Sequence, residues 1–340
     1  MRAVSVLPGG ELAVVDKPDP TPGEGEVVIA VERCGICGSD LHLKSSGLIG
    51  PGAVMGHEFC GRVVDRGAGT DGVAEGDLVS VLPSGRCGVC ALCVSGRSEL
   101  CPAQAMTAIG LGFNDGAYAE FCKAPVRSCY PIPDGMTVEQ GALVEPYAVA
   151  LHAVHRSRVV ADPGLKVGVI GAGPIGLLTV AALRGEGATN VVVAERAEMR
   201  AELASSMGAA SLVSNAGALA TAFGGEQPDV IFDCAGSPLT PPLALEAVTA
   251  GGEIVLVGVV DIGQTLDMPG LLWIIKQVDV RSSIAYTDEE FGQSVDAVAK
   301  GVIDPAVLVS DTRPLAAAQA SFDDLAAGRA VKLLLSPALG

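Results

Sequence analysis

The chain has 340 residues, which is enough for two domains that each bury a core of their own. Its formal net charge of −17 disfavours binding to nucleic-acid phosphates and to anionic membranes. The sequence shows no apolar run long enough to cross a bilayer and no N-terminal signal segment, so we expect a cytoplasmic protein. In that compartment its ten cysteines are expected to be metal ligands or buried thiols rather than disulfides.

The first 150 residues alternate short β-like runs with glycine and proline turns. Strands are expected at 27–31, 61–64 and 77–81, and helical patterns are sparse. We therefore expect residues 1–150 to form an irregular, β-rich domain.

One thiol, one imidazole and one carboxylate occur in this domain at Cys37, His57 and Glu58. Three protein ligands that leave a fourth position open are the stoichiometry of a catalytic zinc site. An isolated histidine is more often an ordinary core or surface residue. The assignment of Cys37, His57 and Glu58 as zinc ligands is therefore supported mainly by a second cluster of candidate ligands in the same domain.

Four further cysteines, Cys87, Cys90, Cys93 and Cys101, lie within one short segment. Cys-x-x-Cys turns bring pairs of sulfurs together, and four thiolates complete a tetrahedral zinc site with no open position. We expect a structural zinc lobe at 86–102. The alternatives are four buried or redox-active thiols, or a nucleic-acid-binding zinc ribbon, which the scarcity of basic residues in this segment disfavours.

After residue 145 strands alternate with helices. A helix is expected at 148–158, and strands are expected at 166–170, 191–194, 229–233 and 253–257 with helices between them. This alternation predicts an α/β domain with a doubly wound parallel sheet over residues 151–287. Residues 288–340 are expected to form helices at 289–300 and 315–327 and a strand at 332–335 that returns to the first domain.

A glycine-rich turn, Gly171-Ala-Gly173-Pro174-Ile175-Gly176, follows the strand at 166–170 and opens a helix. In a dinucleotide site the first glycine makes the tight turn, the second lets the pyrophosphate approach, and the third lets helix meet strand. Glu195, at the end of the next strand, is expected to bind the ribose hydroxyls and to repel a 2′-phosphate. We therefore expect NAD, with NADP as the alternative. A purely structural turn is the other interpretation.

Together these motifs resemble those of the zinc-containing medium-chain alcohol dehydrogenases, in the same order and over essentially the whole chain. The first of them reads Gly35-Ile-Cys37-Gly-Ser39-Asp40-Leu-His42. The resemblance implies a GroES-like catalytic domain, a Rossmann domain, two zinc ions per chain and a nicotinamide cofactor. Val144-Glu145-Pro146 is similar to the polyol, butanediol and threonine dehydrogenase branch, because the ethanol enzymes have a cysteine where Glu145 stands.

The resemblance also implies roles for single residues. Cys37 and His57 would bind the catalytic zinc, with Glu58 or Glu145 as the third protein ligand. Asp40 would orient His57, Ser39 would accept the proton of the substrate hydroxyl, and His42 would pass it on to solvent. Besides the glycine turn and Glu195, the residues implied to lie at the cofactor are Arg196, Arg200, Val257, Val259 and Lys332.

The substrate is expected to be a secondary alcohol or diol, or its ketone. Polyol dehydrogenases have a tyrosine where this chain has Leu43 and an arginine where it has Ala285, which favours a less hydroxylated substrate. The alternatives are an NADP-linked ketone or aldehyde reductase, a cyclic-polyol dehydrogenase and a non-enzymatic zinc protein. We expect a homodimer or homotetramer. Leu48, Ile49, Leu111, Phe113, Tyr147 and Trp273 are expected either at the substrate or in the core.

Overall fold

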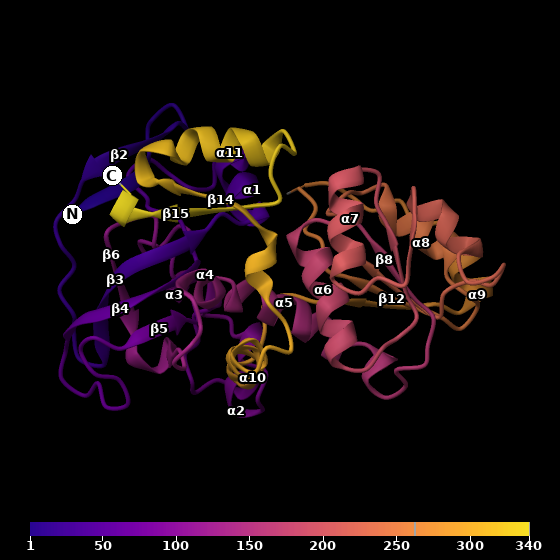
Figure 1. Ribbon diagram of the computed structural model, residues 1–340, viewed down its shortest axis with the longest axis horizontal. Helices are drawn as coiled ribbons and strands as arrows, with labels where there is room; N and C mark the ends of the chain where they lie inside the picture. Colours follow the sequence, from indigo (N-terminus) through magenta and orange to yellow (C-terminus); the bar gives the residue numbers. More distant parts are fainter. Residues whose placement is uncertain (262, 340) are drawn as a thin grey trace. The chain divides into compact units, whose positions relative to one another are not determined.

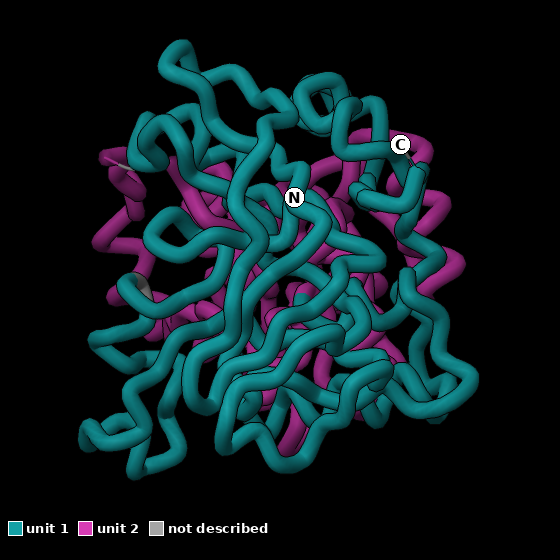
Figure 2. Tube along the Cα trace, turned by 90° about the vertical axis from the view of Figure 1, so that its left-hand side faces the viewer, with its two compact units in different colours: residues 1–145, 286–340 teal, residues 146–285 magenta. Residues whose placement is uncertain are grey.

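The structure, a computed structural model, describes residues 1–261 and 263–339, and at Ala105 the backbone only. The chain forms two compact units, residues 1–145 with 286–340 and residues 146–285 (Figure 1, Figure 2). The first unit is therefore built from both ends of the chain. Among the described residues, no helix has the length and apolar content that crossing a membrane requires.

The first unit contains a seven-stranded sheet in the order β14-β15-β3-β4-β5-β7, with β6 paired to β3, and a separate antiparallel pair, β1-β2. Val27, Ile29 and Phe59 of the central strands lie in one core cluster with Leu333 and Leu335 of the C-terminal strand. The strands are β1 (Arg2–Val6), β2 (Leu12–Asp16), β3 (Glu26–Gly35), β4 (Glu58–Arg66), β5 (Leu78–Val81), β6 (Phe121–Pro125), β7 (Cys129–Pro131), β14 (Val309–Pro314) and β15 (Lys332–Ser336).

The C-terminal segment is part of this sheet. All five residues of β15 are buried, and the strand pairs in parallel with β14 and antiparallel with β3. Figure 1 shows β15 and the helix α11 (Ala318–Ala326), both yellow, beside the indigo strands of the N-terminus. Phe322 of α11 packs edge-on against Tyr118, with ring centroids 6.1 Å apart. The return of the chain thus places Lys332 deep in the first unit.

The helices of the first unit are short, except α10, and several have clear caps. Thr287 caps α10 through a reciprocal capping box with Glu290. The unit also contains the first residues of α5, in which the boundary at 145 lies. Besides α11, the α-helices are α1 (Gly38–Ser46), α2 (Ala91–Val94), α3 (Gln104–Thr107), α4 (Val138–Ala142), α5 (Val144–His155) and α10 (Asp288–Ala299).

The second unit is a six-stranded parallel sheet in the order β10-β9-β8-β11-β12-β13. This order, 3-2-1-4-5-6 in the unit's own numbering, is that of the doubly wound dinucleotide-binding fold. Its elements are β8 (Val167–Ile170), α6 (Pro174–Gly185), β9 (Val191–Ala194), α7 (Glu198–Ser206), β10 (Ser211–Val213), β11 (Val230–Asp233), α8 (Thr240–Ala247), β12 (Glu253–Leu256), α9 (Gly270–Lys276) and β13 (Asp279–Ser282).

The predicted fold class is confirmed: a doubly wound parallel sheet accompanies a separate β-rich unit. The central strands β8, β9 and β11 are buried at every position, which is why they read as continuous apolar runs. The edge strands β10 and β13 are short and mostly exposed, and the sequence did not indicate them.

Candidate metal centres and nucleotide site

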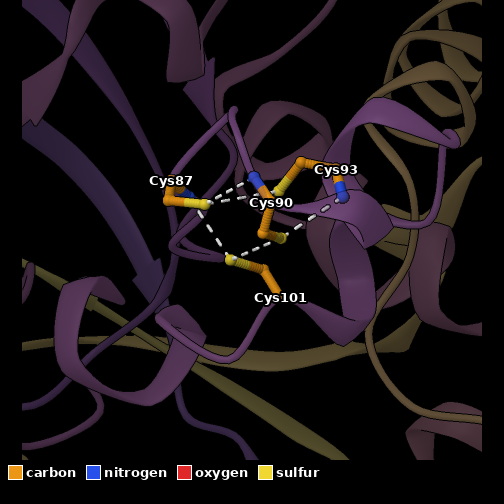
Figure 3. A group of neighbouring side chains, drawn as sticks. All are labelled: Cys87, Cys90, Cys93 and Cys101. Atoms are coloured by element: carbon orange, nitrogen blue, oxygen red, sulfur yellow. Dashed lines mark hydrogen bonds between the residues drawn. The ribbon is translucent and has the colours of Figure 1, made fainter.

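The four-cysteine lobe converges on one point. The ligand atoms of Cys87, Cys90, Cys93 and Cys101 all lie within 4.8 Å of one another, and Figure 3 shows the four sulfurs facing a common centre. The Cys87–Cys93 and Cys90–Cys101 sulfur distances are 4.0 and 3.9 Å. Zinc–sulfur bonds of about 2.3 Å imply a tetrahedral edge of about 3.8 Å. The arrangement therefore fits one four-coordinate zinc ion.

Backbone amides hold this lobe in shape. Cys90 caps the short helix α2 by accepting a hydrogen bond from the Cys93 amide, and its own amide donates to Cys87 Sγ at 3.3 Å. Amides of Val89 and Cys90 lower the pKa of Cys87 to about 6, while burial raises the pKa of Cys93 to about 11. The lowered pKa of Cys87 favours its thiolate, the form that binds metals.

A second group of ligand atoms comes from separate elements. Cys37 precedes α1, His57 precedes β4, and Glu58 is the first residue of β4. Their ligand atoms lie within 4.8 Å of one another, and Glu145 is not a member of this group. Gly35 pairs with Glu58 across β3 and β4, and a β-carbon at Gly35 would lie 2.2 Å from Glu58 Oε2. The sheet register and this glycine together place the carboxylate.

Asp40 orients His57. Its Oδ1 lies 3.4 Å from His57 Nδ1, and neither atom has another hydrogen-bond partner among the described residues. The second oxygen, Oδ2, accepts hydrogen bonds from the Tyr118 hydroxyl at 2.6 Å and from the Cys37 amide at 3.0 Å. A carboxylate at Nδ1 leaves Nε2 as the metal-binding nitrogen. The set therefore fits a zinc ion held by Cys37, His57 and a carboxylate.

Burial and neighbouring charges shift the pKa values of His57 and Tyr118. Burial alone disfavours an imidazolium, but the charge and hydrogen bonds of Asp40, together with Cys37, raise the pKa of His57 well above its usual range. The pKa of Tyr118 is raised well above 10 by burial and by Asp40, so Tyr118 remains a hydrogen-bond donor. Such concentrated negative charge around a histidine favours a cation at this place.

Ser39 and His42 lie on α1. The Ser39 hydroxyl is 3.4 Å from His57 Nε2, which places it beside the position where a metal would bind. His42 follows three residues later on the same helix, and positions three apart share a helix face. Ser39 and His42 therefore follow one another along one face of α1.

Two buried carboxylates have partners from the C-terminal segment. Tyr286 donates a hydrogen bond to Glu145 Oε1 at 2.7 Å, and Lys332 forms an ion pair with Glu58. Burial and the charge of Glu58 raise the pKa of Glu145 to about 7, although His57 and Tyr286 oppose this. Lys332 is 1% exposed and donates also to the Ile36 carbonyl. The expectation that it lies at the cofactor pyrophosphate thus has no support from its partners here.

The glycine turn has the geometry of a phosphate-binding loop. Gly171 follows β8 with φ of +89°, in the left-handed region that favours glycine. A β-carbon at Gly176 would lie 1.9 Å from the Gly171 carbonyl oxygen, so helix and strand can approach only without a side chain there. Gly173 precedes α6, whose first residues are Pro174 and Ile175. The turn therefore leads directly into the N-terminus of α6, the end of a helix that binds phosphates.

Glu195 follows β9 and is tied to this loop. Its Oε2 accepts from the Ala172 amide and its Oε1 from the amides of Arg196 and Ala197, each at 2.8 Å. Burial works against the charge, but these amides and Arg200, 3.7 Å away, lower the pKa of Glu195 overall. Glu195 is thus an anion fixed beside the glycine turn.

The other residues expected at the cofactor or substrate are placed as follows. Val257, just after β12, is buried and Val259 is exposed. Ile49 and Tyr147 are buried in the cores of their units, and Leu111 is half-buried. Leu48 and Phe113 are exposed, and the Trp273 indole donates to the Val278 carbonyl in the second unit.

The sequence analysis did not anticipate three contacts around Cys37 and His57: those of Tyr118 with Asp40, of Tyr286 with Glu145 and of Lys332 with Glu58. A lysine within the apolar run Val331-Lys332-Leu333 was the available signal, because a buried lysine requires a carboxylate partner. The bonds of the two tyrosines depend on sequence separations of 78 and 141 residues, which no local pattern reports.

Two family models match this chain. Residues 23–134 match the alcohol dehydrogenase GroES-like domain, and residues 174–300 match the zinc-binding dehydrogenase domain. Sorbitol dehydrogenase of Bacillus subtilis is 30% identical over 95% of this chain and 93% of its own length. L-threonine 3-dehydrogenase of Stenotrophomonas maltophilia is 32% identical over 94% of both chains.

A solved structure from Sinorhizobium meliloti, provisionally described as a zinc-binding dehydrogenase and bound to NADP, is also similar. It superposes with a TM-score of 0.90 at 32% identity and covers 99% of both chains. With both family models matched and these relatives covered almost end to end, the chain belongs to the zinc-containing medium-chain alcohol dehydrogenase family and is an NAD(P)-dependent oxidoreductase.

Proposed function

We propose that this enzyme transfers a hydride between a secondary alcohol or diol, or its ketone, and NAD. The observation that carries the proposal is the group of half-buried Cys37 with buried His57 and Glu58, which offers three protein ligands in a chain that also has a dinucleotide turn. The sorbitol and threonine dehydrogenases that it resembles act, as their names state, on a polyol and at carbon 3 of threonine.

Cys37, His57 and Glu58 would hold the catalytic zinc, and the four-cysteine lobe would hold the structural one. When bound, the catalytic zinc supplies Lewis acidity that favours loss of the alcohol proton. Asp40, beside His57 Nδ1, would keep His57 Nε2 directed to that zinc. Ser39, whose hydroxyl lies 3.4 Å from that nitrogen, would accept the hydroxyl proton, and His42 on the same helix face would pass it to solvent.

NAD is proposed because Glu195 is an anion fixed beside the glycine turn, where a 2′-phosphate would be repelled. Arg200 neutralises part of that charge and Arg196 is exposed. The Sinorhizobium relative binds NADP, so NADP is the second candidate. Glu195→Ala should relax a preference for NAD; unchanged kcat/KM ratios for the two cofactors would refute the role of Glu195.

A homo-oligomer in the cytoplasm is also part of the proposal. Leu271, Ile274 and Ile275 of α9 are each more than 60% exposed, and β13 next to this helix in sequence lies at the edge of its sheet. Exposed apolar clusters on soluble proteins commonly mark interfaces. Ile274→Asp should shift the mass measured by light scattering to that of a monomer, and an unchanged mass would exclude α9 from the interface.

The direct test is a dehydrogenase screen. Purified zinc-loaded enzyme is given secondary alcohols, vicinal diols, sugar alcohols and L-threonine with NAD or NADP, and reduced nicotinamide is followed by absorbance. We expect turnover of secondary alcohols or diols with NAD. No turnover of any alcohol with either cofactor, in a sample with two zinc ions per chain, would contradict the proposal.

A further inference from the structure

The two carboxylates near Cys37 and His57 are held in different ways. Glu58 belongs to the group whose ligand atoms converge, and Lys332 binds one of its oxygens. Glu145 lies outside that group, and its Oε1 accepts the hydroxyl of Tyr286 at 2.7 Å. Both partners come from the C-terminal segment that returns to the first unit. The contrast raises the question of what keeps Glu145 apart.

Tyr286 is itself rigidly placed. Its side chain is 1% exposed, and its ring centroid lies 5.6 Å from that of Phe291 in α10. The preceding residue, Ala285, has φ of +52°, which is uncommon for a residue other than glycine. Backbone strain of this kind clusters at functional positions.

We propose that Tyr286 is a positioning residue that holds Glu145 away from the catalytic metal, which leaves Glu58 as the third protein ligand and the fourth position open. This proposal rests on the proposed function. A zinc site with two thiolate or imidazole ligands and two carboxylates would be closed, as the four-cysteine lobe is. A single hydroxyl would thus separate a catalytic site from a structural one.

The test is the zinc affinity of the catalytic site, measured by competition with a chelator. Tyr286→Phe removes only the hydroxyl and frees Glu145 to turn. We expect the affinity for zinc to rise about tenfold, the size of effect that outer groups have on metal sites. We also expect KM for the alcohol to rise, because Glu145 then occupies the position that the substrate needs.

Glu145→Gln in the Tyr286→Phe background should remove the gain in affinity, whereas the same change in the wild type should have a smaller effect. A merely structural role of Tyr286 would not produce this coupling between Tyr286 and Glu145. Equal effects of Glu145→Gln with and without the Tyr286 hydroxyl would overturn the proposal, and so would a lower zinc affinity in Tyr286→Phe.

Tyr130→Phe is the matched control. Tyr130 packs on the same ring of Phe291, with centroids 4.8 Å apart, but its hydroxyl donates to the backbone carbonyl of Asp288. We expect no change in zinc affinity from it; a gain like that of Tyr286→Phe would assign the effect to packing and overturn the proposal. If Tyr286→Phe does not fold, Glu58→Gln should still weaken zinc binding more than Glu145→Gln, and the reverse order would overturn the proposal.

Failure of the proposed function gives a different result. The wild type would then bind one zinc ion per chain, in the four-cysteine lobe, and Cys37→Ser would leave that count unchanged. A wild type with two zinc ions and no coupling between Tyr286 and Glu145 would instead refute the positioning role alone.

Discussion

The two metal centres of the first unit are built on opposite plans. In the four-cysteine lobe all ligands lie between Cys87 and Cys101, and backbone amides of the same loop stabilise them. In the second group, Cys37 and His57 come from different elements, Tyr118 and Lys332 bind Asp40 and Glu58 from distant parts of the chain, and Tyr286 binds the nearby carboxylate of Glu145. A local sequence thus suffices for the closed site, whereas the open site depends on the whole unit.

The largest expected effect is on turnover. His57→Ala removes a ligand from the open site. A catalytic metal contributes several kcal/mol of transition-state stabilisation, so we expect its loss to lower kcat/KM by about a thousandfold. The fold and the four-cysteine lobe should persist, because the lobe has its own ligands. Steady-state rates and circular dichroism measure this, and retained activity would refute the catalytic assignment.

The next effect is on stability. Cys90→Ser removes a ligand of the closed site but keeps a side chain that can cap α2. Because metal binding in such lobes is coupled to folding, we expect a loss of about 4 kcal/mol in the free energy of unfolding. Chemical denaturation measures it. A loss of activity without a loss of stability would contradict the division of roles.

Tyr118→Phe tests whether distant residues support the open site. The variant leaves Asp40 Oδ2 without its 2.6 Å hydrogen bond, and we expect zinc affinity at the open site to fall about tenfold. The affinity of the four-cysteine lobe, measured in the same titration, is the internal reference and should not change. Equal losses at both sites would indicate general destabilisation.

The smallest effect concerns pH. A thiol that is protonated in the free protein must release its proton when zinc binds, so its contribution makes affinity rise tenfold per pH unit. Backbone amides lower the pKa of Cys87 to about 6. Above pH 6, Cys87 therefore adds nothing to the slope of log affinity against pH, and below pH 6 it adds one. A titration of the isolated closed site in Cys37→Ser should show that change of slope; a constant slope would contradict it.

The sequence was most informative where interactions are local. The strand at 191–194 was predicted with the bounds that β9 has, because a strand buried on both faces is a continuous apolar run. The helix α1 was missed, because only Asp40 of its nine residues is buried and it has no apolar stripe. The strand β13 was missed because it is a polar edge strand, with no burial pattern to reveal it.

The candidate site shows the same division. The convergence of the four cysteines follows from their spacing alone, whereas the ion pair between Lys332 and Glu58 was not predicted. That contact depends on the pairing of β15 with β3, whose partners are about 300 residues apart in the chain. Long-range register of this kind is fixed by tertiary packing and not by a motif.

The number of zinc ions per chain tests the central claim most directly. Elemental analysis of purified protein should give two for the wild type and one each for Cys37→Ser and Cys90→Ser. Alcohol oxidation should be lost in Cys37→Ser and retained, at temperatures where it is folded, in Cys90→Ser. One zinc ion in the wild type, or full activity in Cys37→Ser, would contradict the account of one open catalytic site and one closed structural site.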